Sequence, residues 1–292
     1  MTRRTWLAVL TFCLIAWHAR AQTPYESQLL GETIAAIQKG RPAGMSEAEW
    51  DEARMFTFLS LGDAGALARP ALPLLTAALA DRNPQVATAA AVALVKLDAP
   101  TNRAGALRRI DAALAGDSPE AYEVARQGLT TMARIPPDVE AILLRVIARP
   151  GAERASFVEA LARLPADRIA ATVPVLAGLL RDTDRDVASA SVETLASFGV
   201  QARGAASDLR ALLASPHRWT RTRTALALLR IESPPDAALA RVLTQAIEES
   251  IAADPNGFDR VRGEAVDGLA TLTPLLDETV DRFSAHAPMT GG

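Results

Sequence analysis

The chain has 292 residues, of which 49% are hydrophobic but only 4% aromatic, and its formal net charge is −3. This weakly acidic balance argues against general affinity for nucleic acid or for an anionic membrane. The single cysteine, Cys13, lies in the N-terminal segment considered next, so the rest of the chain offers no disulfide, thiolate metal ligand or cysteine nucleophile.

The first 21 residues have the three regions of a secretory signal peptide in order. Arg3 and Arg4 form a positive start, residues 6–17 form an apolar run, and Ala19-Arg20-Ala21 forms a small-x-small cleavage site. The apolar run is too short to span a bilayer, which needs about 20 residues. We therefore expect residues 1–21 to be removed and the mature protein to be periplasmic or secreted.

The sequence indicates export more clearly than it indicates which export route is used. Residues 2–7 also resemble the twin-arginine motif, but the short positive start and strongly apolar core favour the general secretory route. Removal of residues 1–21 leaves 28 basic against 34 acidic residues, a net charge of −6. No later segment is long and apolar enough to span a membrane, so we expect no membrane insertion after signal removal.

A nine-residue pattern recurs seven times along the rest of the chain. Its first, fifth, eighth and ninth positions are apolar or small in most copies, which predicts a helix whose buried stripe allows close helix packing. Successive copies begin 32 to 41 residues apart, which is the spacing of a repeat architecture. The copies are Trp50–Phe58, Val86–Leu94, Ala121–Leu129, Glu153–Leu161, Val187–Leu195, Thr220–Leu228 and Val261–Leu269.

A second apolar helix is predicted upstream of each copy. Pro73 and Pro174 each lie 13 residues before the start of a copy, where a proline opens or kinks a helix. Short polar turns such as Asp81–Pro84 separate the two helices and supply N-cap residues. Residues 25–39 predict a helix that caps one end of the array, and residues 274–283 predict another at the other end.

This arrangement resembles the HEAT repeat, in the short bacterial form also found in phycobilisome lyase-type proteins. The resemblance rests on the paired helices, the proline in the first helix and the V-R-x-x-A-A-x-A-L pattern in the second. The resemblance implies an all-α fold, a right-handed α-solenoid of about seven HEAT-like helix pairs. We expect one domain over residues 22–285 and a flexible tail at 286–292. The tetratricopeptide repeat has a similar period, but its tryptophan, tyrosine and phenylalanine pattern is missing.

The sequence offers little to catalysis. After the signal segment the only histidines are His217 and His286, no His-Glu dipeptide is present, and no glycine-rich nucleotide-binding fingerprint occurs. Asp254, Asn256 and Asp259 could supply oxygen ligands to Ca²⁺, but their spacing departs from the calcium-loop motif and favours a simple turn. We therefore predict no enzyme, no catalytic residue, no cofactor and no metal.

HEAT-type proteins usually bind partners on a concave face lined by the second helices. In this chain the second helices carry both positive and negative charges, so we expect the partner to be a protein or peptide and not a nucleic acid. The alternatives are a lyase-like or accessory protein for an enzyme, a binder of an anionic glycan through the Arg218–Arg262 strip, or a merely solvated helix face. Tryptophan and arginine dominate interface energetics. The candidate partner-binding residues are Arg218, Trp219, Arg221, Arg223, Arg260, Arg262, Tyr122 and Arg126.

Overall fold

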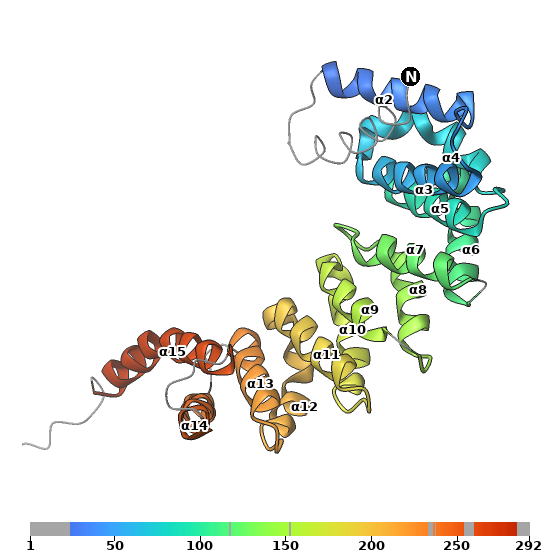
Figure 1. Ribbon diagram of the computed structural model, residues 1–292. Coiled ribbons are helices and arrows are strands. Elements are labelled where there is room, and N and C mark those ends of the chain that lie inside the picture. The colour runs from blue at the N-terminus through green and yellow to red at the C-terminus, as the bar shows by residue number, and fades with distance from the viewer. Residues whose placement is uncertain are drawn as a thin grey trace, which may run out of the picture. The chain divides into compact units, whose positions relative to one another are not determined.

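The computed structural model describes residues 24–284 apart from 117, 152, 233–235, 237 and 254–259 (Figure 1). Three features of the sequence lie outside the described residues. They are the predicted signal peptide at 1–21, the predicted tail at 286–292, and the residues considered as calcium ligands, Asp254, Asn256 and Asp259. Within the described ranges the chain is all-α, with no strand. This confirms the predicted fold class.

Two series of helices alternate along the chain. The series that carries the nine-residue copies consists of α3 (Glu47–Asp63), α5 (Pro84–Lys96), α7 (Pro119–Thr130), α9 (Arg154–Ala160), α11 (Arg185–Phe198), α13 (Arg218–Ile231) and α15 (Arg260–Ser284). The preceding helices are α2 (Pro24–Lys39), α4 (Leu72–Ala78), α6 (Arg103–Leu114), α8 (Pro137–Ile147), α10 (Ala166–Leu179), α12 (Ala206–Leu212) and α14 (Ala238–Ala253). Short 3₁₀ helices join or extend them at η1 (Gly65–Ala71), η2 (Pro100–Asn102), η3 (Leu161–Arg163) and η4 (Gly199–Ala205).

All seven predicted second helices are confirmed, as is the N-terminal helix at 25–39. The copy that starts at Glu153 fits least well, because Glu153 has left-handed backbone geometry and α9 begins one residue later. In α7 the predicted stripe of Ala121, Ala125, Gly128 and Leu129 is buried, whereas Glu123 and Gln127 are exposed. The pattern of small and apolar positions therefore identified the packing face of this helix correctly.

The chain divides into two compact units, residues 1–133 and residues 134–292. In the first unit α3 packs on α5 and α5 packs on α7. In the second unit α9 packs on α11, α11 on α13, and α13 on α15. Each unit is thus a stack of repeats, whose stability comes from neighbour contacts. That residues 22–285 form one uninterrupted, right-handed solenoid stays a prediction.

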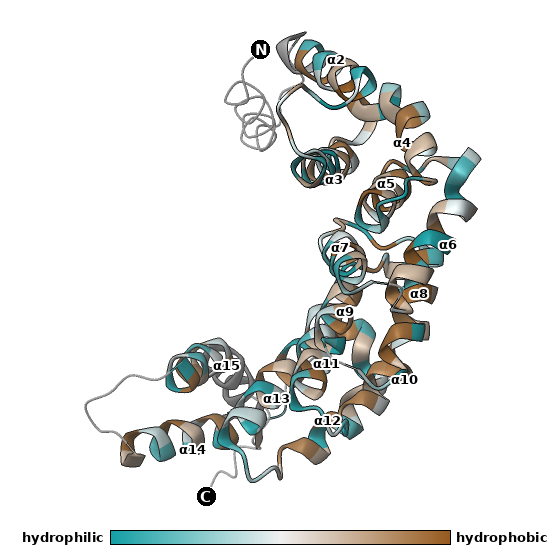
Figure 2. Cartoon of the chain, turned by 45° about the vertical axis from the view of Figure 1, so that its right-hand side comes forward, coloured by the Kyte–Doolittle hydropathy of each residue, from teal (hydrophilic) through white to brown (hydrophobic). Residues whose placement is uncertain are grey.

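Helix α5 forms the core of the first unit. Residues 86–95 are buried without a break, and Figure 2 shows the helix largely in the hydrophobic colours. Two glycines let its neighbours approach closely: a Cβ on Gly62 of α3 would lie 2.8 Å from the Ala93 Cα, and one on Gly128 of α7 would lie 2.5 Å from the Val92 Cγ1. Since α5 has no exposed face over residues 86–95, these residues cannot contribute to a binding surface.

The second unit uses the same packing device. A Cβ on Gly268 of α15 would lie 2.5 Å from Leu226 Cδ2 of α13, so glycine again permits a close helix contact. Gly268 and Gly128 both occupy the eighth position of their copies. Thr194, at the same position of α11, is buried and donates a hydrogen bond to the Val158 carbonyl of α9 at 3.1 Å. The eighth position is therefore where neighbouring second helices touch.

Polar turns start most of the second helices, as predicted. The side chains of Asn83, Ser118 and Asp184 each accept a hydrogen bond from a backbone N–H in the first turn of α5, α7 and α11. Helix α13 differs, because its N-cap residue is His217, whose side chain makes no capping bond. Ser215 instead accepts a hydrogen bond from the His217 N–H at 3.3 Å.

The prediction of a separate terminal helix at 274–283 is wrong. Helix α15 runs without a break from Arg260 to Ser284, so Pro274 lies inside it. A proline in a helix interior removes one backbone hydrogen bond and strains the turn before it, but a long helix can continue past it. Residues 270–273 include no glycine or acidic turn residue that would end the helix earlier.

Candidate functional site

The structure places six of the eight candidate residues on two packed helices of the second unit. Arg218, Trp219, Arg221 and Arg223 lie on α13, and Arg260 and Arg262 lie on α15. Tyr122 and Arg126 lie on α7 of the first unit.

Arg223 is the centre of the polar contacts in the second unit. Its Nη1 donates to Glu193 of α11 at 2.7 Å, and its Nη2 donates to Glu264 of α15 at 2.8 Å. Its Nε also lies 2.7 Å from Glu264 Oε2. One arginine therefore links three successive second helices on one side of the stack.

Trp219 lies one helical turn before Arg223, and the guanidinium carbon of Arg223 is 5.2 Å from the centre of its ring. This is a cation–π distance. Trp219 remains 36% exposed, whereas the Arg223 side chain is only 15% exposed. The tryptophan is thus presented to solvent over an arginine that two carboxylates hold in place.

Arg221 has a structural task. Its Nη1 donates to the Ser215 carbonyl at 2.9 Å and to the Pro216 carbonyl at 3.1 Å, and its Nη2 pairs with Glu249 of α14. Its side chain is 13% exposed. Arg221 therefore ties the start of α13 to the next helix pair and has little charge to offer a partner.

The remaining arginines of the cluster are also engaged. Arg260, 79% exposed, pairs with Glu264 one turn later, and the Nε of Arg262 donates to Ser250 Oγ at 3.1 Å. Arg218 is half-buried and also has an interaction within the chain. The carboxylates of Glu193, Glu249 and Glu264 thus compensate much of the positive charge that the sequence displays.

The contacts of Arg221 recur elsewhere in the repeat. Arg154, at the same second position of its copy, donates Nε to the Ile147 carbonyl at 2.9 Å and holds Asp182 with both terminal nitrogens. The hydrogen bond from Arg154 keeps the pKa of Asp182 below its usual value, against a smaller opposing effect of burial. In the first unit Arg54 pairs in the same way with Asp81 of the following turn. These pairs join residues 27 or 28 positions apart, so they couple one repeat to the next.

On α7, Arg126 pairs with Glu123 one turn earlier, at 2.8 Å from its Nε, and Tyr122 is half-buried with an interaction inside the chain. The interaction of Arg126 with a neighbouring exposed carboxylate is that of an ordinary helix surface. Nothing in these contacts distinguishes the α7 residues as a site.

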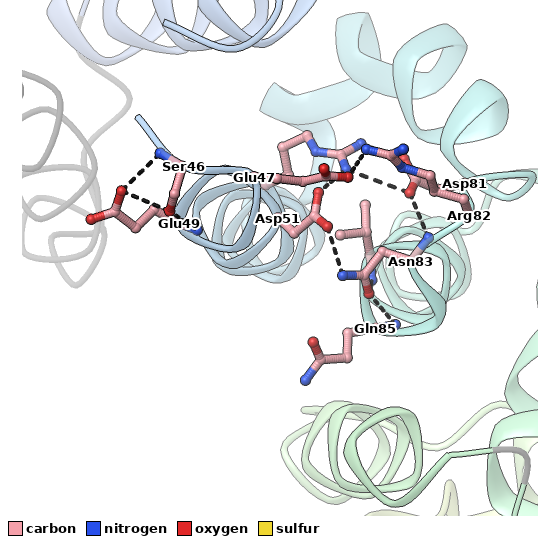
Figure 3. Close-up of polar contacts among 10 residues, drawn as sticks. Ser46, Glu47, Glu49, Asp51, Asp81, Arg82, Asn83 and Gln85 are labelled. Carbon is pink, nitrogen blue, oxygen red and sulfur yellow. Dashed lines mark hydrogen bonds and ion pairs between the residues drawn. The ribbon is translucent and has the colours of Figure 1, made fainter. Parts of the chain in front are cut away.

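The sequence interpretation missed a polar cluster in the first unit, at the start of α3 and the α4–α5 turn. Figure 3 shows Asp51 of α3 pointing toward Asn83, beside Asp81 and the pair formed by Arg82 and Glu47. Arg54 pairs with both aspartates and lies 5.9 Å from the centre of the Trp50 ring. Trp50 and Arg54 repeat the four-residue spacing of Trp219 and Arg223, which is the signal that could have revealed this cluster.

No group of three or more histidine, cysteine, aspartate or glutamate side chains among the described residues is placed to hold a metal ion. None of the described helices has the length and apolar character needed to cross a membrane.

Comparisons with known proteins assign neither a family nor a function to the chain. No model of a protein family matches the chain, and no curated protein matches it. Among solved structures, the crystal structure of one engineered protein matches with a TM-score of 0.46 and 20% identity, over 82% of this chain and 67% of the other. A second engineered protein matches with a TM-score of 0.31 and 17% identity, over 84% of this chain and 96% of the other.

Proposed function

We propose that this protein is an exported, non-catalytic scaffold of HEAT-type repeats that binds a protein or peptide partner. The binding surface is the exposed side of α11, α13 and α15 in the second unit. Trp219 is its anchor, and Glu193, Arg223 and Glu264 form its polar surroundings. Export rests on the signal peptide predicted from the sequence.

The observation that carries the proposal is the fixed presentation of Trp219. Ordering a side chain on binding costs about 0.5–1.5 kcal/mol, and an anchor already held in place avoids part of that cost. Arg223 holds the ring from one side and is itself fixed by carboxylates from two neighbouring helices. Exposed tryptophan beside arginine is the composition of an interface hot spot.

The charges favour a protein over an anionic glycan. A protein that binds an anionic glycan needs cationic side chains available to pair with sulfate or carboxylate groups. Arg221 and Arg223 each already pair with glutamate within the chain. Alternating arginine and glutamate across α11, α13 and α15 suits a partner that carries both signs of charge.

The pairing also decides which variant tests the proposal. Replacing Arg221 or Arg223 by glutamate would break contacts between repeats and confuse lost binding with lost folding. Trp219→Ala removes the exposed anchor and leaves the Glu193 and Glu264 pairs intact. Val200→Ala is the matched control, because Val200 is an apolar side chain on η4 with 54% exposure.

The experiment is affinity capture from periplasmic extract with wild type and both variants, followed by titration calorimetry with each captured protein. We expect wild type and Val200→Ala to retain the same partner, and Trp219→Ala to weaken its affinity by about 2 kcal/mol or more, as hot-spot tryptophans do. A partner that binds all three proteins equally well would rule out this surface. Binding to a sulfated glycan that fades between 0.15 M and 0.5 M salt would favour the glycan alternative, because salt screens such contacts.

A further inference from the structure

The polar cluster of the first unit surrounds a hollow of about 480 Å³. A volume of this size suits a small organic molecule. It is bounded by the start of α3, the chain before it and the α4–α5 turn. The lining residues are Arg41, Glu47, Trp50, Asp51, Arg54, Asp81 and Arg82.

The two inner carboxylates of the hollow are already satisfied. Asp51 accepts hydrogen bonds from Arg54 and, at 2.8 Å, from the Asn83 side chain. Asp81 accepts from Arg54 and, at 2.9 Å, from the Asn83 backbone N–H. Burial alone would lower the pKa of Arg54, but its hydrogen bonds to Asp81 and Asp51 outweigh this and raise it. These two aspartates therefore have little capacity left for a cation.

The hydrogen-bond donors of the hollow are not all satisfied. Arg54 Nε is buried, and no group in the described chain accepts a hydrogen bond from it. This nitrogen has almost no accessible surface, so a ligand in the hollow does not reach it, and Arg54 contributes its positive charge to the hollow rather than this hydrogen bond. Arg41 donates Nη1 to the Met45 carbonyl and meets no carboxylate among the described residues.

The rim can supply one further cation. Arg82 and Glu47 pair with each other across the hollow's edge, and their side chains are 76% and 55% exposed. A pair this exposed is weak, so the carboxylate of a ligand can replace that of Glu47 at small cost. Trp50 is the only aromatic residue among those that line the hollow.

From these features we infer that the hollow binds a small organic carboxylate, with the carboxylate on Arg41 and Arg82, near Arg54, and the organic part against Trp50. Charge-assisted bonds from arginine to carboxylate are the strong ones in proteins, and the planar guanidinium suits two oxygens at once. The site is independent of the proposed partner surface, since every lining residue belongs to the first unit.

The test uses the full chain labelled with 5-fluorotryptophan and titrated with benzoate, followed by ¹⁹F NMR. Trp50→Phe assigns the Trp50 signal. Benzamide, which has the same ring and no charge, is the control ligand. We expect benzoate to shift the Trp50 signal in a saturable way and to leave Trp219 unmoved, and we expect benzamide to shift neither.

Two variants separate binding from folding because their effects have opposite signs. Arg41→Gln should weaken benzoate about tenfold, the effect of losing one charged hydrogen bond. Glu47→Gln frees Arg82 and should tighten benzoate severalfold. Arg69→Gln, on the exposed surface of η1, should change nothing. The inference is overturned if benzoate leaves the Trp50 signal unmoved, if benzamide shifts it equally, or if affinity is the same in the Arg41 and Glu47 variants.

Discussion

Replacing Gly128 by alanine tests the repeat packing directly. Gly128 lies on α7 where that helix crosses α5, and a Cβ at this position would lie 2.5 Å from Val92 Cγ1 and 2.7 Å from Val92 Cγ2. Real Cβ atoms essentially never come this close to another heavy atom. Val92 is 1% exposed, so the added methyl group would meet a side chain that is enclosed in the core.

The expected magnitude is the balance of two opposing effects. Alanine is favoured over glycine in a helix interior by about 1 kcal/mol. Adding a methyl group to a filled core costs about 1–3 kcal/mol. Because the overlap involves both Val92 methyl groups, we expect the upper part of that range and a net loss of about 1–2 kcal/mol in the free energy of unfolding. Gly178 on α10 is the control, because nothing lies within 4 Å of its added Cβ and alanine should stabilise there.

The assay is urea unfolding followed by circular dichroism for wild type, Gly128→Ala, Gly178→Ala, Val92→Ala and the Gly128→Ala/Val92→Ala double variant. Shortening Val92 should relieve the overlap, so the double variant should be more stable than the sum of the two single effects by about 1–3 kcal/mol. Equal stabilisation by Gly128→Ala and Gly178→Ala would refute the close contact between α5 and α7.

Three further predictions follow from individual residues. Because Arg154 lowers the folded-state pKa of Asp182, this pair contributes stability above pH ~4 and loses it as the pH falls through the lowered pKa. Asp182→Asn should therefore lose less stability than wild type between pH 6 and pH 2 in urea titrations, and parallel losses would contradict this. Thr224 is fully buried with no partner for its hydroxyl in the described chain, so Thr224→Val should raise the free energy of unfolding by about 1 kcal/mol. A destabilised variant in thermal unfolding would show that the hydroxyl is satisfied. Mass spectrometry of the exported protein should find Gln22 as the first residue, and an intact Met1 would refute the signal peptide.

The helix pattern was predictable because it depends on local spacing. Small and apolar residues at positions one, five, eight and nine predicted the buried face of α7 and the contact positions of Gly128 and Gly268. The end of α15 was not predictable in the same way. Pro274 resembles Pro73 and Pro174 in the sequence, but Pro73 lies at the start of α4, Pro174 lies inside α10, and Pro274 lies inside the much longer α15.

The candidate site was predicted only in part, because one-dimensional charge does not show where an arginine points. Trp219 and Arg223 are four residues apart, which is one turn of a helix, and the structure places them close together. Arg221 looks equally basic in the sequence, but it turns back to the Ser215 carbonyl and to Glu249, which is 28 residues away. Such contacts depend on the stacking of neighbouring repeats. The same separation joins Arg154 to Asp182, and this recurrence is the sequence signal for structural arginines.

Site-specific photocrosslinking tests the central claim, that the Trp219 surface binds a partner, most directly. A benzoylphenylalanine at position 219 places the reactive group on the exposed side of α13, and one at position 200 on η4 is the control. In cells that export the protein, we predict a discrete light-dependent protein adduct from position 219 and none from position 200. No adduct from position 219, or the same adducts from both positions, would contradict the claim.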